Sequence, residues 1–491
     1  MQLPLTINRR GALPLQRQIV EQVRQLVRSG VLLSGTRLPS TRALSEQLGV
    51  SRSTVVIAYD RLILEGYLET RSASATVISR TLPRPLLGEP ESADQDDPRG
   101  KTPKRGYPLA FQGERPRLYA PEQNKLPYDF RIGRPDASLF PTKTWRRLLF
   151  EVLGGAEYPL TEYGDPAGLL ELRTAISDHL RMARGIRSTS EQVIIVAGCQ
   201  EGLNLISRLL IARGTGVVVE NPTYQGAAFA FRSYGAKLLP TPIDQDGLDV
   251  GELPRGGAQV AYVTPSHQFP LGVTLSLERR LELLDWARSV GAYIVEDDYD
   301  SDFRYQASPL LALQGLDQHG CVIYLGTFSK SIGAGLRLGY VVVPEQLIES
   351  ATTAKALMNN GHPWMEQAVV AQFLRSGSFE NHLAKIRHAY MLRRDCLVGE
   401  LEKHFGQCRL DGLEGGMHAS WHLPESACDA FELQERLKNT GVGIYSLRAG
   451  PAHRLVAFPG DDRIVLLGYP CLSERKIVEA IDRIARVVGG V

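Results

Sequence analysis

The sequence lacks the features that mark membrane proteins, secreted proteins and many metal-binding proteins. No apolar run reaches the roughly 18 residues that a membrane span needs, and the start MQLPLTINRR has no apolar signal-peptide core. The six cysteines are scattered, without the CxxC pairs that are typical of zinc sites or the spacing of a disulfide framework. We therefore expect a cytoplasmic protein with reduced thiols and no bound metal.

Lysine is absent from residues 1–80, whereas arginine is abundant there. This segment holds 11 arginines against 5 acidic residues, which gives a net charge of +6. The whole chain of 491 residues has a net charge of only +2, so the remainder carries the difference, −4. A basic N-terminal segment on a nearly neutral chain predicts a polyanionic partner for that segment. The length of the chain predicts two or three domains.

Three helical segments follow one another closely near the N-terminus. In residues 15–30, apolar side chains recur at helical spacing. A second helix fits STRALSEQLG with Ser40 as its cap, and a third fits SRSTVVIAYDRLILEGYL with Ser51 as its cap. The next residues, YLETRSASATVI, alternate like two short strands around a turn, which would form a wing. This order is typical of a domain that places its third helix in the major groove of DNA.

The run RLPSTRALSEQLGVSRSTVVIAYDRLILEGYL resembles the winged helix-turn-helix of the GntR superfamily of bacterial regulators. The resemblance implies five DNA contacts at the N-terminal ends of the second and third helices: Arg42, Ser51, Arg52, Ser53 and Thr54. Arginine forks and hydroxyls at helix N-termini suit phosphate oxygens and base edges. In place of the family's usual Gly-x-Gly, the wing tip reads Ser-Ala-Ser-Ala, residues 72–75. The alternative is a small helical domain with solvated arginines.

Composition divides the rest of the chain into two parts. Residues 81–126 are rich in proline, charge and small side chains without periodicity, which predicts a flexible and largely extended linker. In residues 127–491, apolar β-branched runs alternate with helical stretches, which predicts an α/β domain whose largely parallel sheet is covered on both faces. The runs are VIIVAG, GVVVEN, QVAYVTP, YIVEDD, CVIYLG and GYVVVP. Ligands of such sheets lie at the carboxyl ends of the strands.

Polar residues follow three of these runs. Gly198, Cys199 and Gln200 form a glycine turn before a helix, and the free amides of such a turn can hold a phosphate. The acids Asp297 and Asp298 either bind a metal or cap a helix. Lys330 ends CVIYLGTFSK, and an amine in a half-buried site loses its proton easily and forms a Schiff base with an aldehyde. A lysine that extends from a loop into solvent is the alternative.

The order of these motifs resembles the whole large domain of fold type I pyridoxal 5'-phosphate (PLP) aminotransferases. The motifs are the glycine turn, ENPTYQG, PSHQFPLG, EDDYD and TFSKxxxxGxR, and the likeness covers nearly all of residues 127–491. It implies a mostly parallel sheet, large and small subdomains, and Lys330 as the residue that holds PLP as a Schiff base. The glycine turn, Gly198, Cys199 and Gln200, would then bind PLP.

The same resemblance assigns the remaining cofactor contacts. Asp297 pairs with the pyridinium nitrogen, Tyr299 bonds the phenolic oxygen and Tyr224 stacks on the ring. The phosphate is bound by Arg337, and Thr327 and Ser329 take the hydroxyl positions before the lysine. The run TEYGDPAGLLELR resembles the segment whose tyrosine reaches the cofactor phosphate of the other subunit, which makes Tyr163 that residue and implies a homodimer.

Two positions depart from working aminotransferases. PSHQFPLG replaces the family's Asn-Pro-x-Gly, and Gln268 is the candidate that takes over the contact with the ring oxygen. Leu466 stands in RIVLLGYPCLS where those enzymes carry the arginine that binds the substrate's α-carboxylate. Either Arg463, Arg454 or Arg448 substitutes for it, or the ligand is not an ordinary α-amino acid. In the second case the cofactor itself, an amine or a sulfonate becomes the effector.

A GntR-type domain followed by an aminotransferase-like domain is the architecture of the MocR subfamily, which the whole sequence resembles. The resemblance implies a PLP-dependent transcriptional regulator that senses PLP or a small amine, binds repeated half-sites of double-stranded DNA and forms a head-to-tail homodimer. One alternative is an active aminotransferase with an accessory DNA-binding head, against which Leu466 argues. The other is a DNA-binding protein with an empty scaffold body, against which the retention of Lys330 and Arg337 argues.

Overall fold

The computed structural model of the chain contains two compact units, Met1–Tyr107 and Pro108–Val491. The structure describes residues 2–9, 11, 13–71, 75–79, 116, 126–155, 162–305, 310–448 and 450–489. The predicted linker, residues 81–126, lies outside the described residues except for Pro116 and Leu126. No helix in the described ranges is both long enough and apolar enough to cross a membrane.

The first unit contains three helices and a two-stranded antiparallel sheet. The elements are α1 (Leu15–Arg28), α2 (Thr41–Leu48), α3 (Arg52–Leu64), β1 (Leu68–Arg71) and β2 (Ala75–Ile78). All three helices and both strands contribute to one apolar core, in which Val23, Leu44 and Leu62 are fully buried. The predicted helices and the two strands of the wing are confirmed, and the wing-tip residues 72–74 lie outside the described residues.

Two serine caps and one glycine set the geometry of the helix pair. The Ser40 Oγ accepts a hydrogen bond from the Ala43 N–H, and the Ser51 Oγ accepts one from the Thr54 N–H, both at 3.2 Å. Between the two helices, Gly49 has a φ of 63°, a left-handed conformation that ends α2. A serine cap stabilises a helix by about 1 kcal/mol relative to alanine. The two serines and the glycine therefore fix the helix ends through contacts with residues close to them in sequence.

The second unit is organised around an eight-stranded sheet with the order β4-β12-β11-β10-β9-β5-β7-β8. The strands are β4 (Val193–Val196), β5 (Gly216–Asn221), β7 (Lys237–Asp244), β8 (Gly247–Leu248), β9 (Val260–Val263), β10 (Tyr293–Asp298), β11 (Val322–Thr327) and β12 (Gly339–Val342). Neighbours from β11 to β7 are parallel, whereas β12 and β8 are antiparallel to their neighbours. All six predicted strands are present. We did not predict β7, whose run KLLPTPID contains two prolines, which strands usually exclude.

Helices cover both faces of this sheet because successive side chains of its strands point to opposite faces. Val217 and Val219 pack in one apolar cluster with residues of α6 (Cys199–Leu210) and α7 (Gln225–Ser233), while Val218 packs in another with α8 (Leu277–Val290). The antiparallel end of the sheet packs with α5 (Leu170–Arg184), α11 (Trp364–Arg375) and α12 (Ser378–Phe405). Further helices are α4 (Thr142–Gly154), α9 (Leu313–Leu316) and α10 (Ile348–Asn359).

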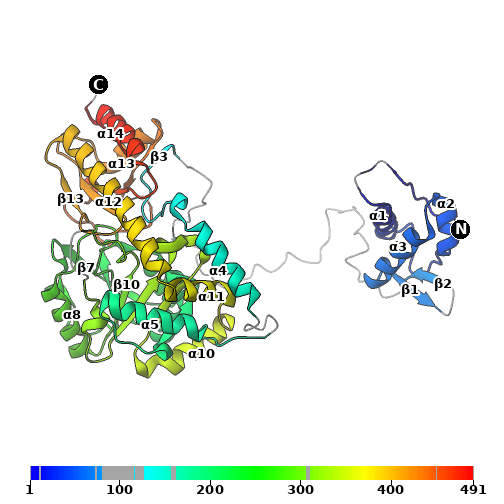
Figure 1. Ribbon diagram of the computed structural model, residues 1–491, viewed down its shortest axis with the longest axis horizontal. Helices are drawn as coiled ribbons and strands as arrows, with labels where there is room; N and C mark the ends of the chain where they lie inside the picture. The colour runs from blue at the N-terminus through cyan, green and yellow to red at the C-terminus, as the bar shows by residue number, and fades with distance from the viewer. Residues whose placement is uncertain are drawn as a thin grey trace, which may run out of the picture. The chain divides into compact units, whose positions relative to one another are not determined.

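A smaller subdomain is formed by the C-terminal part of the chain around a sheet with the order β13-β14-β18-β16. Its elements are β13 (Arg409–Asp411), β14 (His418–His422), α13 (Ala430–Lys438), β16 (Tyr445–Ser446), β18 (Ile464–Gly468) and α14 (Glu474–Gly489). Figure 1 shows α13 and α14 together at one end of this unit, with the long α12 leading from them toward the helices around the large sheet.

Two short strand pairs connect distant parts of the second unit. β3 (Tyr128–Asp129) pairs in parallel with β15 (Val442–Gly443), so the first described residues after the predicted linker belong to the small subdomain. β17 (Ala452–His453) pairs with β6 (Thr223–Tyr224), which ties a loop of the small subdomain to the large one. Both pairs bring residues of separate sequence regions to the same cavity.

Candidate functional site

A cavity of about 320 Å³ lies at the carboxyl ends of the parallel strands. Nine of the predicted cofactor residues line it: Cys199, Gln200, Tyr224, Asp297, Tyr299, Thr327, Ser329, Lys330 and Arg337. Most of them lie at or just after the ends of β10 and β11, or at the start of α6. Ligands of parallel sheets bind at this edge, outside the carboxyl ends of the strands. The topology therefore brings most of the predicted constellation together.

Lys330 lies in a short helical turn directly after β11. Its Nζ donates a hydrogen bond to the carbonyl oxygen of Gly133 at 2.7 Å. Burial lowers the pKa of the Lys330 amine below its usual value of 10.5, although nearby acidic groups such as Asp300 oppose the shift. The neutral amine is the form that attacks a carbonyl carbon. The lowered pKa therefore favours covalent attachment of an aldehyde at this residue.

Asp297 is a buried carboxyl near the end of β10. Its Oδ2 accepts a hydrogen bond from the Tyr262 hydroxyl at 2.8 Å, and its Oδ1 accepts one from the Cys199 thiol at 3.6 Å. Burial raises the pKa of Asp297 to about 6. Burial disfavours the ionised form of this carboxyl, and a cationic partner inside the same cavity stabilises that form. A protonated ring nitrogen is a partner of that kind.

The residues around Gly198 suit an anion. Gly198 has a φ of 85° and precedes α6, whose N-terminal amides point away from the helix. The Arg337 guanidinium donates to the Ala197 carbonyl at 2.5 Å, and a Cβ at Gly198 would lie only 3.1 Å from that guanidinium. The Thr327 hydroxyl donates to the Ser329 hydroxyl at 2.9 Å. Amides, a guanidinium and hydroxyls are the donors that phosphate binds.

The two predicted tyrosines line the same cavity. The Tyr224 ring packs edge to face on Phe269, with 5.6 Å between the ring centroids. The Tyr299 hydroxyl donates to the His267 carbonyl oxygen at 3.1 Å. Burial raises the pKa of both phenols, so both remain protonated hydrogen-bond donors at neutral pH.

Three predicted residues, Gly198, Gln268 and Tyr163, are not part of the cavity wall, although Gly198 directly precedes the wall residues Cys199 and Gln200. The buried Gln268 amide group lies 3.2 Å from Glu220 and 2.9 Å from the Pro222 carbonyl, so it faces the protein interior behind the cavity. Tyr163 is 88% exposed on the surface of the second unit. The structure does not bring either side chain to the other predicted cofactor residues within one chain.

The cavity wall also contains residues that we did not predict: Arg131, Gly133, Tyr262, Thr264 and His418. Tyr262 and Thr264 lie at the end of QVAYVTP, and that position at a strand end was the one available signal. Arg131 and His418 reach the cavity through tertiary pairing, for which the sequence has no local pattern. Behind the wall, burial raises the pKa of Glu220 to about 7, and its carboxylate accepts from the Thr264 hydroxyl at 2.6 Å.

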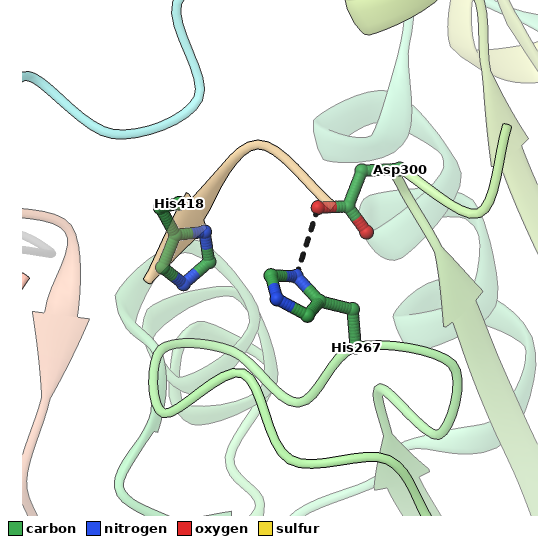
Figure 2. A group of neighbouring side chains, drawn as sticks. All are labelled: His267, Asp300 and His418. Atoms are coloured by element: carbon green, nitrogen blue, oxygen red, sulfur yellow. Dashed lines mark hydrogen bonds and ion pairs between the residues drawn. The ribbon is translucent and has the colours of Figure 1, made fainter. Parts of the chain in front are cut away.

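Three buried side chains, His267, Asp300 and His418, form a cluster beside the cavity. Figure 2 shows the His267 ring directed at Asp300, with Nδ1 2.9 Å from Oδ2, and His418 next to it. The two imidazole rings meet edge to face with centroids 4.6 Å apart. Burial and the neighbouring His267 lower the pKa of His418 well below its usual value, so His418 is neutral. Its Nε2 lies 2.8 Å from the Pro270 carbonyl oxygen, to which it donates.

This cluster lies between the large and small subdomains. A Cβ at Gly272 or Gly412, both with a positive φ, would approach the His267 Nε2 to 3.0 Å or 2.9 Å. Glycine at both places therefore lets the two chain segments close around the imidazole. The hydrogen bond to Asp300 and this packing account for the position of His267.

The carboxylate-binding arginine missing at position 466 has no replacement among the three arginines we considered. Leu466 is fully buried on β18 in an apolar cluster with Phe269 and other side chains. None of the three lines the cavity: Arg463 donates to the Pro424 carbonyl, Arg454 pairs with Asp461 at 2.5 Å, and Arg448 is exposed.

The predicted DNA contacts lie at the N-terminal ends of α2 and α3. Arg42, Ser51, Arg52 and Ser53 are exposed, and Thr54 is half-buried. The Ser51 hydroxyl lies 2.9 Å from that of Ser53 and 2.7 Å from that of Thr54. The Arg52 guanidinium donates to the Thr41 hydroxyl at 3.4 Å, which links the first turns of the two helices. The structure therefore presents hydroxyls and guanidinium groups on one exposed region.

Comparison with known proteins identifies both units. Residues 15–78 match the family of bacterial regulatory proteins called the gntR family, and residues 136–484 match aminotransferase class I and II. The chain is 38% identical to the probable rhizopine catabolism regulatory protein MocR of Rhizobium meliloti, over 97% of this chain and 94% of that protein. It is 34% identical to the pyridoxine biosynthesis transcriptional regulator PdxR of Corynebacterium glutamicum, over 85% of each chain.

A solved structure supports the assignment of the second unit. The crystal structure of Pyrococcus horikoshii kynurenine aminotransferase superposes with a TM-score of 0.68 at 30% identity, covering 75% of this chain and 92% of that chain. Fold and site thus define a winged helix-turn-helix transcriptional regulator with a fold type I aminotransferase domain. The chain belongs to the MocR subfamily of GntR regulators.

The predicted family, fold class and cofactor are confirmed by these matches. A gntR-family domain binds DNA, and an aminotransferase class I and II domain binds PLP. The cavity fits PLP in its chemistry, because it combines a lysine whose amine pKa is lowered, a buried carboxyl with a raised pKa and a set of phosphate donors. The residue assignments within the site remain predictions.

Proposed function

We propose that this chain is a transcriptional regulator whose second unit senses PLP or a small amine and thereby changes how the DNA-binding units occupy repeated half-sites. The observation that carries the proposal is the combination of a desolvated lysine in a cofactor cavity with exposed DNA-contact side chains in one chain. Bound PLP supplies an aldehyde carbon to which a primary amine can attach in place of the lysine amine. Two relatives support the proposal by their names, because MocR is named as a regulator of catabolism and PdxR as a regulator of pyridoxine biosynthesis.

Each side chain of the cavity has its own role in binding the cofactor. Lys330 provides the covalent attachment, Asp297 the partner of the ring nitrogen and Tyr299 the donor to the phenolic oxygen. Tyr224 covers the ring face. The phosphate is bound by the following groups: Arg337, Thr327, Ser329, and the amides of Gly198, Cys199 and Gln200. Gln268 supports the site indirectly, through its contact with Glu220.

We also propose a head-to-tail homodimer in which Tyr163 completes the cofactor site of the partner. Tyr163 is 88% exposed, and the apolar side chains of Leu170 and Leu357 are 54% and 70% exposed. A Cβ at Gly361 would lie 3.4 Å from the Asp165 carbonyl oxygen, so the segment after Tyr163 packs against the end of α10. Exposed apolar side chains are common at protein interfaces. A two-fold dimer also matches DNA with paired half-sites.

Similarity to an aminotransferase structure favours one second candidate, an active aminotransferase with an accessory DNA-binding unit. The regulator is the better supported function, because relatives named as transcriptional regulators match nearly the whole chain and because Leu466 replaces the substrate-binding arginine. Steady conversion of an amino donor at about 1 per second or faster would favour the enzyme. Absence of PLP binding would favour a scaffold without a cofactor.

The experiment that tests the proposal is fluorescence anisotropy with the DNA upstream of the chain's own gene. Binding is measured at one salt concentration, because phosphate contacts make affinity strongly salt-dependent. Wild type and Lys330→Ala are each measured with and without PLP. We expect PLP to change the affinity or stoichiometry of the wild type and to have no effect on Lys330→Ala. Tight binding that ignores both PLP and the substitution would contradict cofactor-coupled regulation.

A further inference from the structure

We infer that Arg9 contacts a phosphate of the DNA backbone and that an N-terminal arm holds it in place for this contact. The arm consists of residues 2–9, which precede the gntR-family match at residues 15–78. A gntR-family domain binds DNA, so Arg9 makes this contact whatever ligand the second unit senses. None of the five DNA contacts that the family resemblance implies lies in the arm.

The arm is attached to the helices of the first unit by three glutamine side chains. Each glutamine contacts both backbone groups of one arm residue: its amide oxygen accepts from the N–H, and its amide nitrogen donates to the carbonyl oxygen. The pairs are Leu3 with Gln47 on α2, and Thr6 with Gln22 and Asn8 with Gln18 on α1, at distances from 2.5 to 3.2 Å. The Leu3 side chain is also buried in the apolar core of the unit. The arm therefore follows a fixed course along the two helices.

The arm ends beside the turn between α2 and α3. The Arg9 guanidinium donates to the carbonyl oxygen of Gly49, the residue that ends α2. A Cβ at Gly49 would lie 3.4 Å from the Arg9 Nη2, so the guanidinium lies directly against this turn. Ser51, the cap of α3, comes two residues later, at most about 7 Å along the chain. The cation is therefore held beside the end of α3 that a helix-turn-helix directs at the DNA.

Arg9 has the chemistry that a phosphate contact needs. It is exposed, and its contact with Gly49 uses one guanidinium nitrogen, Nη2, of a group that carries five N–H donors. Arginine binds phosphate oxygens through several such donors at once. A contact of this kind fixes the position of the protein on the duplex and carries no sequence information. Arg9 therefore differs from Arg52, whose predicted contact is at the end of α3 itself.

The alternative role of Arg9 is that of a helix cap alone. An arginine near the C-terminal end of a helix binds a free carbonyl oxygen and interacts favourably with the helix dipole. A side chain that only caps α2 contributes to the stability of the first unit and leaves the salt dependence of DNA binding unchanged. A side chain that binds a phosphate releases a counterion, so its loss lowers the slope of log Kd against log salt concentration by about 1 for each DNA-binding unit. Salt dependence therefore distinguishes the two roles.

The first test measures DNA affinity over a range of salt concentrations. The full-length protein is titrated against the upstream DNA and against an unrelated duplex of the same length, with fluorescence anisotropy as the readout. We expect Arg9→Gln to weaken binding to both duplexes about 2- to 10-fold at physiological salt and to lower the slope by about 1 per unit. Arg28→Gln is the matched control, because it removes an exposed arginine at the C-terminal end of α1. It should leave both the affinity and the slope unchanged.

The second test releases the arm and keeps the arginine. Gln18→Ala and Gln22→Ala together should weaken DNA binding as Arg9→Gln does, because the guanidinium is then no longer held at the turn. Adding Arg9→Gln to this pair should cause no further loss, since all three changes remove the same contact. Arg9→Lys should retain the salt slope, because lysine also neutralises a phosphate. Circular dichroism shows that each variant is folded under the conditions of the titration.

The third test locates the phosphate. In a series of duplexes, one phosphate at a time is replaced by a neutral methylphosphonate. We expect a position at which the wild type loses affinity and Arg9→Gln does not. Equal sensitivity of the two proteins at every position would overturn the inference, as would an unchanged salt slope in Arg9→Gln or an equal loss in Arg28→Gln. A lower melting temperature of Arg9→Gln with unchanged DNA binding would assign Arg9 to the cap of α2 alone.

Discussion

The two functional sites of this protein are built in opposite ways. In the first unit the predicted DNA contacts, such as Arg52 and Ser53, are exposed at helix ends. In the second unit Asp297 is buried, and burial shifts the pKa values of both Asp297 and Lys330. Exposed charges exchange counterions for phosphates at little cost, whereas covalent attachment of an aldehyde requires an amine that burial keeps neutral. Hydration is therefore useful at one site and harmful at the other.

Covalent attachment of the cofactor should distinguish the two sites most strongly. Borohydride reduction of the protein with bound PLP, followed by mass spectrometry, should show stable addition of the reduced cofactor to the wild type. We expect Lys330→Ala to show none, because no other lysine lines the cavity among the described residues. Arg52→Ala should be labelled like the wild type, since it changes only the first unit. Labelling of Lys330→Ala at the wild-type level would place the attachment elsewhere.

The second effect is the converse, a loss of DNA binding without loss of cofactor. We expect Arg52→Ala to weaken DNA binding about 10- to 100-fold, because an arginine contact to a base edge contributes about 1–3 kcal/mol. Arg61→Ala is the matched control on the same helix, where the guanidinium pairs with Glu65 at 3.0 Å. Anisotropy at several salt concentrations measures both variants. Equal losses in both would mean that general charge, and not the end of α3, directs binding.

The third effect concerns pH and the buried carboxyl. The pKa of Asp297 is raised from 3.8 to about 6 in the folded protein, so the unfolded chain releases this proton first as pH rises. Stability of the cofactor-free protein therefore falls between about pH 4 and pH 6, by up to about 3 kcal/mol from this group. Asp297→Asn should lack this part of the fall. Urea unfolding of both proteins across this pH range measures the free energy of unfolding. If this free energy depends on pH in the same way in both proteins, the raised pKa of Asp297 is contradicted.

The smallest effect compares the two units by an identical substitution. Ser51 caps α3, and Ser276 caps α8, where its Oγ accepts from the Arg279 N–H at 3.4 Å. Alanine at either position should destabilise its own unit by about 1 kcal/mol, which hydrogen exchange of the first helical turn measures. We expect only Ser51→Ala to weaken DNA binding in addition. A similar DNA effect from Ser276→Ala would show that the cap acts through stability alone.

Local signals explain most of what the sequence predicted. Ser40 and Ser51 cap helices through neighbouring amides, and Lys330 follows an apolar strand within a few residues, so short patterns were sufficient. Arg131 was not predicted because it reaches the cavity through the pairing of β3 with β15, strands separated by most of the second unit. Gln268 was expected at the cofactor because of its place in PSHQFPLG, but its amide turns toward Glu220. Side-chain direction in a loop follows no period that a sequence displays.

The proposed function requires that the cavity of the second unit and the DNA-binding surface of the first are energetically coupled. Coupling between two binding sites must be reciprocal. The decisive measurement is therefore the complete cycle: the Kd for upstream DNA with and without saturating PLP, and the Kd for PLP with and without that DNA. We predict the same factor, different from one, on both sides of the cycle, and its loss in Lys330→Ala. A factor of one on both sides would contradict the coupling.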